Sequence, residues 1–340
     1  MKTLLLSKND VAQCLDMESV IVAVEEAYKT FQRGMVTQPA IQGMSMEKFH
    51  AAMDVKTCNN NDTDQMSMKI VGLYPGNAKG EGKYKTSEGG ILPNMMGNLI
   101  LSDAQTGATI AIMDSSLITG IRTGAAGAVS AKYMSREDSK VAAVFASGAQ
   151  ARNQIYAVSL VRDLEEVRVY DKFGTPEGFA AYKEFIESKT KAKVIICDTV
   201  EEAAKGADIL VCPTPSREAY LMADYVKPGM HIIEVGTDAD FKNELEPAVF
   251  GKADKIVCDS IAQCIVRGDT QNAIKGGAIT KDDIYGEIGE IVLGLKPGRD
   301  SAEEITIFDT TGMAIQDNTT AASCYEVAVK KGIGSWFEFI

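Results

Sequence analysis

Residues Val144 to Arg152 read VFASGAQAR and stand between an apolar run and a segment with helical spacing. The stretch is a variant of the G-x-G-x-x-G pattern: Gly148 is its one glycine, and Ala146 and Ala151 replace the other two. A strand, a turn and a helix in this order place backbone N–H groups at a helix N-terminus, where pyrophosphate is stabilised. Alanine replaces glycine where φ is negative or where helices pack. The stretch therefore indicates a dinucleotide site, with a strand-to-helix turn of a non-nucleotide domain as the alternative.

A carboxylate follows this turn at a meaningful distance. Asp171 stands 23 residues after Gly148 and ends the next predicted strand, EVRVYD. This spacing is close to that of the acidic residue that accepts from the ribose hydroxyls of a dinucleotide. A carboxylate there repels a 2′-phosphate, so NAD(H) is favoured over NADP(H), although the neighbouring Lys172 acts against this preference.

Around the turn, strands alternate with helices. A helix of small residues, SLITGIRTGAAGAVSAKYM over 116–134, leads to strands VAAVF, EVRVYD, KVIIC, ADILVCPT, HIIEVG and KIVCD, with helices GAQARNQIYAVSLV, PEGFAAYKEFIESK and VEEAAKG between them. Several of these strands are apolar on both faces, which predicts a doubly wound parallel sheet of the Rossmann class. A last strand, EEITIFD, is followed by a turn at Thr311 and Gly312 and a helix from about Met313, which we expect to pack back on the N-terminal part.

The N-terminal third has a different pattern. Apolar residues at helical spacing predict one amphipathic helix from Val11 to Phe31, ended by Gly34. Strands are predicted over 66–77 and within 98–114, the latter as a pair joined by a turn at residues 105–107. The segment from Gly76 to Gly90, rich in Gly, Lys and Ser, is predicted to be a surface loop.

Composition narrows the class of ligand. The chain has 340 residues, 45% of them apolar, and a formal charge of −12, which disfavours nucleic acid and anionic membranes as partners. A small-molecule ligand is expected. With neither a signal peptide nor an apolar run long enough to span a bilayer, the protein is predicted to be cytoplasmic. Seven scattered cysteines and only two histidines argue against a disulfide framework and a zinc site, and no metal is expected.

Three polar residues in apolar or strand-end contexts are candidates for chemistry. Lys69 interrupts the apolar strand MSMKIVGL, where it either holds a carboxylate or points to solvent. Arg122 is a lone guanidinium in a helix of small residues and needs an anion, which a substrate carboxylate, a cofactor phosphate or a structural aspartate would supply. Asp238 follows a strand end, where it, or Asp240 instead, is placed for acid–base chemistry, with a plain Asx-turn as the alternative.

Five ordered motifs now carry a resemblance: MKIVGLYPGN, the IRTGAAGAVSAKYM helix, SGAQA, VGTDADFKNEL, and GEIGEIVLGLKPGR followed by ITIFDTTGMAIQD. Together they resemble the ornithine cyclodeaminase and μ-crystallin family over nearly the whole chain. The resemblance implies a homodimer. It also implies a substrate-binding and dimerisation domain of residues 1–121 plus 314–340, with an inserted Rossmann NAD-binding domain of residues 122–313.

The resemblance also implies roles for residues. Lys69 and Arg122 match positions that contact the substrate carboxylate, and Lys69 and Asp238 match the catalytic positions, with Asp238 taking part in proton transfer. The cofactor set it implies is Ser147, Gly148, Ala149 and Gln150 on the pyrophosphate, Asp171 on the ribose, and in addition Arg122, Thr123, Lys172, Thr237 and Asp238.

One departure bears on the substrate. In TQPAIQGM, Ala40 stands where many relatives carry an arginine that clamps the substrate carboxylate, and Lys79, Lys83 or Lys85 of the following loop are candidates to replace it. The sequence thus predicts an NAD(H)-dependent oxidoreductase acting on the C–N bond of a small α-amino or α-imino acid, an imine reductase or amino-acid dehydrogenase. The alternatives are an ornithine cyclodeaminase-type ammonia-lyase with bound NAD and a non-catalytic, μ-crystallin-like ligand-binding protein.

Overall fold

The computed structural model describes residues 1–80 and 84–339. The chain divides into two compact units: unit 1 comprises Met1–Arg122 and Met313–Ile340, and unit 2 comprises Thr123–Gly312. The boundaries expected from the sequence lie within one residue of these. Each unit is built around its own sheet of eight strands.

Unit 2 is the doubly wound domain. Its sheet has the order β10-β9-β8-β11-β12-β15-β13-β14, and every neighbouring pair is parallel. The strands are β8 (Val141–Val144), β9 (Glu166–Val169), β10 (Lys193–Ile196), β11 (Ile209–Cys212), β12 (His231–Glu234), β13 (Lys255–Cys258), β14 (Gly286–Glu287) and β15 (Thr306–Asp309). The predicted Rossmann class is confirmed.

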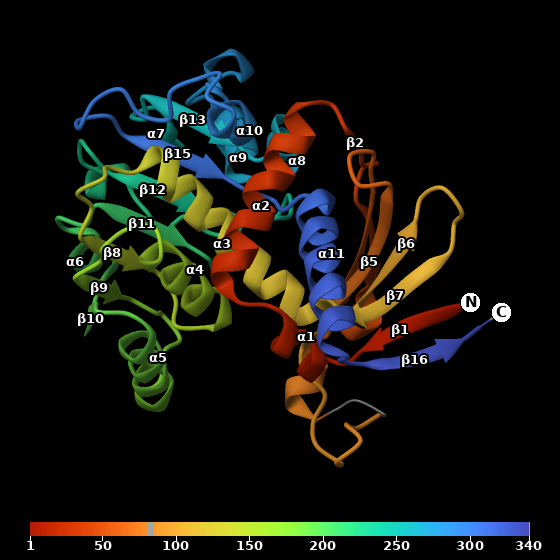
Figure 1. The fold of residues 1–340 in the computed structure, drawn as a ribbon. Coiled ribbons are helices and arrows are strands. Elements are labelled where there is room, and N and C mark those ends of the chain that lie inside the picture. The colour runs from red at the N-terminus through yellow and green to blue at the C-terminus, as the bar shows by residue number, and fades with distance from the viewer. Residues whose placement is uncertain (81–83, 340) are drawn as a thin grey trace. The chain divides into compact units, whose positions relative to one another are not determined.

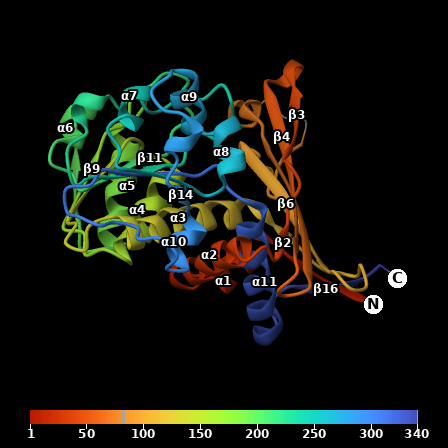
Figure 2. The same ribbon diagram turned by 90° about the horizontal axis from the view of Figure 1, so that it is seen from above.

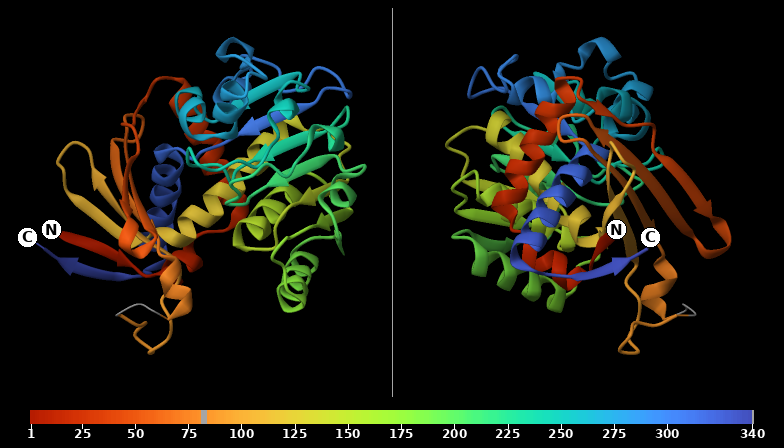
Figure 3. Two further views of the ribbon diagram at one scale, coloured as in Figure 1. Left: turned by 180° about the vertical axis from the view of Figure 1, so that it is seen from behind. Right: turned by 45° about the vertical axis from the view of Figure 1, so that its right-hand side comes forward.

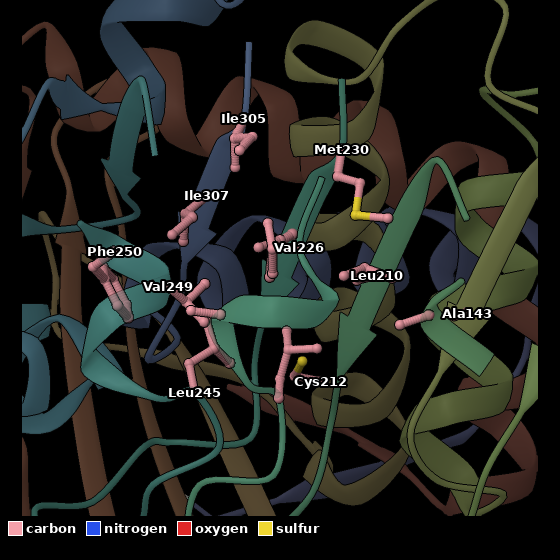
Figure 4. Packing of buried hydrophobic residues seen from close by; sticks show 14 of the residues in the cluster. Ala143, Leu210, Cys212, Val226, Met230, Leu245, Val249, Phe250, Ile305 and Ile307 are labelled. Atoms are coloured by element: carbon pink, nitrogen blue, oxygen red, sulfur yellow. The ribbon is translucent and has the colours of Figure 1, made fainter. Parts of the chain in front are cut away.

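Helices cover both faces of this sheet. Figure 2 shows it nearly edge-on, with α6, α7 and α9 on one side and α3 and α4 on the other. The helices are α3 (Ser115–Met134), which belongs to unit 2 from Thr123 onward, α4 (Ala149–Ser159), α5 (Pro176–Lys189), α6 (Val200–Ala204), α7 (Pro247–Phe250), α8 (Ile261–Arg267), α9 (Asp269–Lys275) and α10 (Ile288–Val292). Between the sheet and one helix layer lies a core of apolar side chains, among them Leu210, Ile307, Val249 and Phe250, none more than 1% exposed (Figure 4). Burying this apolar surface is what stabilises the layered arrangement.

Strand order identifies the edge of the unit 2 sheet at which ligands of this fold bind. From β8, the chain runs outward through β9 to β10 and then crosses to β11 on the other side. Ligands of such sheets bind at the carboxyl ends of the strands where the order reverses, here between β8 and β11. VFASGAQAR connects β8 to α4 at that position.

Unit 1 carries a mostly antiparallel sheet. Its order is β16-β1-β7-β6-β5-β4-β2, with β3 also paired to β4, and only β1 and β7 run parallel. The strands are β1 (Lys2–Leu6), β2 (Val36–Thr37), β3 (Gln42–Met46), β4 (Ala51–Asn60), β5 (Gln65–Leu73), β6 (Met95–Asp103), β7 (Thr109–Asp114) and β16 (Ser335–Glu338). Strands β1 and β16 pair, so the two termini lie side by side at one edge of this sheet (Figure 1, Figure 3).

Three further helices complete unit 1: α1 (Lys8–Cys14), α2 (Met17–Gln32) and α11 (Ala314–Lys331). The single helix predicted over 11–31 is wrong, because Asp16 is extended and its Oδ1 accepts from Ser19 N at 2.7 Å, which caps a new helix. Helix α11 packs against α2 and against β4, β5 and β6, so the last helix does return to the N-terminal part. It thereby covers one face of the sheet.

In β5 the apolar residues are exposed and the polar residues are buried, which is the reverse of the usual pattern. Met66, Met68 and Ile70 are 44%, 42% and 36% exposed, whereas Ser67 and Lys69 are buried. A strand with one solvated face normally buries its apolar residues instead. Met44, Met95 and Met96 of β3 and β6 are exposed as well. The register of the sheet places Met44, Met66, Met68, Ile70 and Met96 on one face, which we call the apolar face.

All seven cysteines are buried, and none forms a disulfide bond. Among residues 1–80 and 84–339, no helix is long and apolar enough to cross a membrane, and no group of three or more His, Cys, Asp or Glu side chains is arranged to hold a metal ion.

Candidate active site

Lys69 lies on the face of β5 that α11 covers, and it is only 1% exposed. Its Nζ is 2.7 Å from Oδ2 of Asp317 on α11, and it donates to Thr119 Oγ1 at 3.3 Å. The alternative in which Lys69 points to solvent is therefore wrong, because strand alternation turns its apolar neighbours outward. A buried ammonium requires such a partner, since desolvation of an unpaired charge is prohibitive.

Arg122 shares the same carboxylate. Its Nε lies 3.0 Å from Asp317 Oδ1, and one terminal nitrogen donates to Gln316 Oε1 at 3.2 Å. Gln316 is held in turn by its own donation to Tyr28 Oη at 2.6 Å. A structural aspartate, one of the three partners expected for Arg122, is thus present, and Lys69, Arg122 and Asp317 form one buried cluster.

A third cation adjoins the cluster. Lys56 of β4 is the direct cross-strand partner of Lys69 and is 8% exposed. Burial lowers the pKa of Lys69 to about 7; the Asp317 carboxylate opposes this shift, and Arg122 and Lys56 add to it. Burial acts to raise the pKa of Asp317, yet Lys69, Arg122 and Lys56 together hold it below its usual value. Two cationic side chains, Lys69 and Arg122, thus share the single carboxylate of Asp317, and an organic anion fits the chemistry of this cluster.

The segment around Ala40 supplies no charge to this cluster. Ala40 is exposed in an irregular stretch, and its neighbour Gln38 accepts from Ile315 N at 3.3 Å. Of the loop lysines expected to compensate, Lys85 is exposed and donates to Gly80 O at 3.4 Å, while Lys83 lies outside the described residues. Lys56 was missed in the sequence because a lysine in a strand usually points to solvent; its position 13 residues before Lys69 shows its importance only once the hairpin register is known.

In unit 2, the glycine turn is open to a ligand. Gly148 is the N-cap of α4 with φ of −77°, and no side chain caps the helix. A Cβ built on Gly148 meets no atom within 4 Å, and Ala149 beside it is exposed. The start of an 11-residue helix that no side chain caps, with open space beside Gly148, fits a pyrophosphate group.

Asp171 is oriented by the same turn. Its Oδ2 accepts from Ser147 N at 2.9 Å and from Ser147 Oγ at 2.6 Å, and its Oδ1 accepts from Phe173 N at 2.9 Å. The carboxylate is fixed at the carboxyl end of β9, next to the strand that leads into the turn. Lys172 is exposed, and its Nζ lies 5.7 Å from the centre of the Phe173 ring.

The other expected site residues of unit 2 lie at two places. Thr123 is buried on α3, where its carbonyl accepts from Gln154 Nε2 at 2.7 Å. Thr237 is fully buried just beyond β12 and donates its N–H to Glu234 Oε1 at 2.8 Å. Asp238, next in sequence, has a side chain that is 54% exposed and forms an ion pair with Lys242. This exposure leaves the carboxylate of Asp238 open to solvent and to a ligand.

Buried acids beneath this turn were not anticipated. Glu234, Glu244, Asp269 and Asp309 are each 0% exposed, and none takes part in an ion pair found within residues 1–80 and 84–339. Burial raises the pKa of each, for Asp269 to about 7. Strand register explains part of the grouping, because Glu234 and Asp309 are direct partners across β12 and β15.

Known proteins resemble the chain over its full length. The family model described as "Ornithine cyclodeaminase/mu-crystallin family" matches residues 1–332. An alanine dehydrogenase of Archaeoglobus fulgidus is 36% identical, with 100% of this chain and 99% of that protein covered.

Two solved structures show the same fold. One, an archaeal alanine dehydrogenase dimer with bound NAD, has a TM-score of 0.90 at 34% identity and covers 100% of both chains. The other, Delta(1)-pyrroline-2-carboxylate reductase of Thermococcus litoralis in complex with NADH and L-proline, has a TM-score of 0.90 at 33% identity and covers 98% of this chain and 99% of that one.

Proposed function

The chain belongs to the ornithine cyclodeaminase/mu-crystallin family, and from this premise we propose that it is an NAD(H)-dependent oxidoreductase acting on the C–N bond of a small α-amino or α-imino acid. The observation that carries the proposal is the buried cluster around Asp317, where two cationic side chains, Lys69 and Arg122, share one carboxylate. A substrate carboxylate supplies the second anion for these two cations.

In this proposal, unit 1 binds the carboxylate of the amino-acid or imino-acid substrate. Lys69 and Arg122 are oriented by Asp317, so their positions are set before the substrate arrives, and less entropy is lost on binding. Lys56 takes the part that an arginine at the position of Ala40 plays in other members. A lysine whose pKa lies near 7 also exchanges a proton with substrate close to neutral pH, which suits acid–base chemistry at the substrate nitrogen.

Unit 2 holds the cofactor. Ser147, Gly148, Ala149 and Gln150 receive the pyrophosphate, and the fixed Asp171 carboxylate accepts from the ribose hydroxyls and disfavours a 2′-phosphate. The bound NADH supplies the hydride. The exposed carboxylate of Asp238 transfers the proton at the substrate nitrogen, directly or through a water. The remaining proposed cofactor contacts are made by Arg122, Thr123, Lys172 and Thr237.

A homodimer is part of the proposal. The apolar face exposes methionine and isoleucine side chains of β3, β5 and β6, and exposed apolar surface of this kind marks a contact with a protein partner. A second copy of the chain is the partner we infer, because the similar archaeal alanine dehydrogenase is a dimer. The predicted cytoplasmic location stays a prediction.

NADH absorbance tests the function. We expect NADH oxidation with pyruvate plus ammonia or with a cyclic imino acid such as pyrroline-2-carboxylate, and none with Lys69→Met, which keeps the volume and removes the charge. Ammonia release from ornithine with no net change in absorbance would favour the cyclodeaminase alternative. NADH binding without turnover of any amino or imino acid would favour the ligand-binding protein.

A further inference from the structure

Two buried glutamates accept hydrogen bonds from the backbone of the Gly236–Asp238 turn. Thr237 N donates to Glu234 Oε1 at 2.8 Å, and Gly236 N donates to Glu244 Oε2 at 2.9 Å. Asp238 N donates in turn to Gly236 O at 3.2 Å. The position of the Asp238 backbone therefore depends on the position of Gly236.

Glu244 also accepts hydrogen bonds from residues that follow β11. Its Oε1 accepts from Thr214 N at 2.6 Å, from Thr214 Oγ1 at 2.7 Å and from Tyr220 Oη at 2.6 Å. Thr214 follows β11 and Gly236 follows β12, and these strands are parallel neighbours. One buried carboxylate thus ties together two loops at the edge of the sheet where ligands of this fold bind.

The carboxylate has little freedom of its own. Asp269 Oδ2 accepts from Glu244 N at 2.9 Å and from Leu245 N at 3.0 Å, which fixes its backbone to α9. The contact with Gly236 is equally tight, since a Cβ at Gly236 would lie 2.1 Å from Thr214 O and 2.2 Å from Glu244 Oε2. Four donors, a fixed backbone and this close approach define one position for the turn.

We propose that Glu244 is a positioning residue for the reaction: it sets the geometry of the turn that presents Thr237 and Asp238. The inference rests on the proposed function. Only a carboxylate serves, because both oxygens accept hydrogen bonds. A glutamine of the same size keeps Oε1 for Thr214 and Tyr220 and turns an N–H donor toward the Gly236 N–H, so it releases the turn selectively.

The test compares Glu244→Gln with Glu246→Gln. Glu246 is a matched control because its Oε2 also accepts one backbone N–H, from Ala223 at 2.7 Å, but none from the turn. In Glu244→Gln we expect faster amide hydrogen exchange over residues 235–240 and a fall in kcat of about 10- to 100-fold, because small misplacements of reacting groups are costly. The Kd of NADH and the KM of the imino acid should change less than about threefold. Glu246→Gln should leave exchange over 235–240 and kcat unchanged.

The outcomes separate the two claims. An active wild-type enzyme whose kcat and exchange are the same in both variants overturns the role of Glu244, as does an equal loss of kcat in both, which would reflect stability alone. If Glu244→Gln does not fold by circular dichroism, Tyr220→Phe removes one donor only, and an unchanged kcat there overturns the inference. A wild-type protein that never oxidises NADH overturns the proposed function, while exchange over 235–240 still reports whether Glu244 orders the turn.

Discussion

Lys69 Nζ lies 2.7 Å from Asp317 Oδ2, and both side chains are 1% exposed. One residue comes from a central strand and the other from the last helix of the chain, so closing unit 1 is what brings them together. Asp317 serves Arg122 at the same time. The pair is a structural contact and, in our proposal, the support that keeps two cations ready for a substrate carboxylate.

Replacing Asp317 should cost stability. Asp317→Asn leaves Lys69 and Arg122 buried without their counter-charge, and breaking a buried pair from one side costs about 3–5 kcal/mol of unfolding free energy. Urea denaturation measures this. The control is Glu26→Gln, which removes exposed ion pairs to Lys29 and Arg33 and should cost less than about 1 kcal/mol. Equal losses in the two variants would mean that the cluster is not the energetic centre of unit 1.

Binding of a carboxylate should depend on pH. Because the pKa of Lys69 is lowered to about 7, its ammonium form prevails below that pH and its neutral form above it. Pyruvate, which has no group titrating in this range, should therefore bind more weakly as pH rises through about 7, by at most about tenfold per pH unit. Calorimetric titration from pH 6 to 9 measures this dependence. It should be flat in Lys69→Met, and a dependence that persists there would assign the titration to another group.

Cofactor choice should follow Asp171. Asp171→Ser removes the carboxylate that faces the proposed ribose position, so the preference for NADH over NADPH should fall about tenfold or more, which corresponds to 1.4 kcal/mol. Fluorescence titration with both cofactors measures this. Lys172→Gln is the opposite control: NADH affinity should stay the same and NADPH affinity should fall. A preference that Asp171→Ser leaves intact would place the discriminating contact elsewhere.

Substitution by alanine should affect NADH affinity at Gly148 and folding stability at Gly124. Gly148→Ala puts a methyl group into open space, so stability should change by less than about 1 kcal/mol while NADH affinity falls. In Gly124→Ala the new Cβ would lie 2.7 Å from Asn153 O, and such overpacking costs about 1–3 kcal/mol. Thermal unfolding with and without NADH distinguishes the two. Undiminished NADH affinity in Gly148→Ala would remove the turn from the cofactor site.

Local patterns in the sequence predicted unit 2 well. Each predicted strand and helix there depends on residues close in sequence: apolar runs of four to six residues, helical spacing, and Gly148 or Pro176 at helix starts. The α5 helix matches the predicted segment residue for residue, and α3 begins one residue before the predicted one. Parallel sheets buried on both faces produce such clear signals because every strand must be apolar.

Unit 1 was harder for a physical reason. Strands β1 to β4 and β16 were not predicted, because β2 is only two residues long and a sheet with an apolar exposed face lacks the usual alternation. The sequence singled out Lys69 and Arg122 but not Asp317 or Lys56. Those two join the cluster through the packing of α11 and the register of the β4–β5 hairpin, and neither is encoded by neighbouring residues.

The seven buried thiols can report how fast unit 1 and unit 2 each open. Because none is exposed, an alkylating reagent reaches a cysteine only when the surrounding structure opens. Cys14, Cys58 and Cys324 belong to unit 1, whereas Cys197, Cys212, Cys258 and Cys264 belong to unit 2. Mass spectrometry of alkylated peptides over time would therefore give separate opening rates for the two units in one sample, and added NADH should slow only those cysteines whose exposure its binding suppresses.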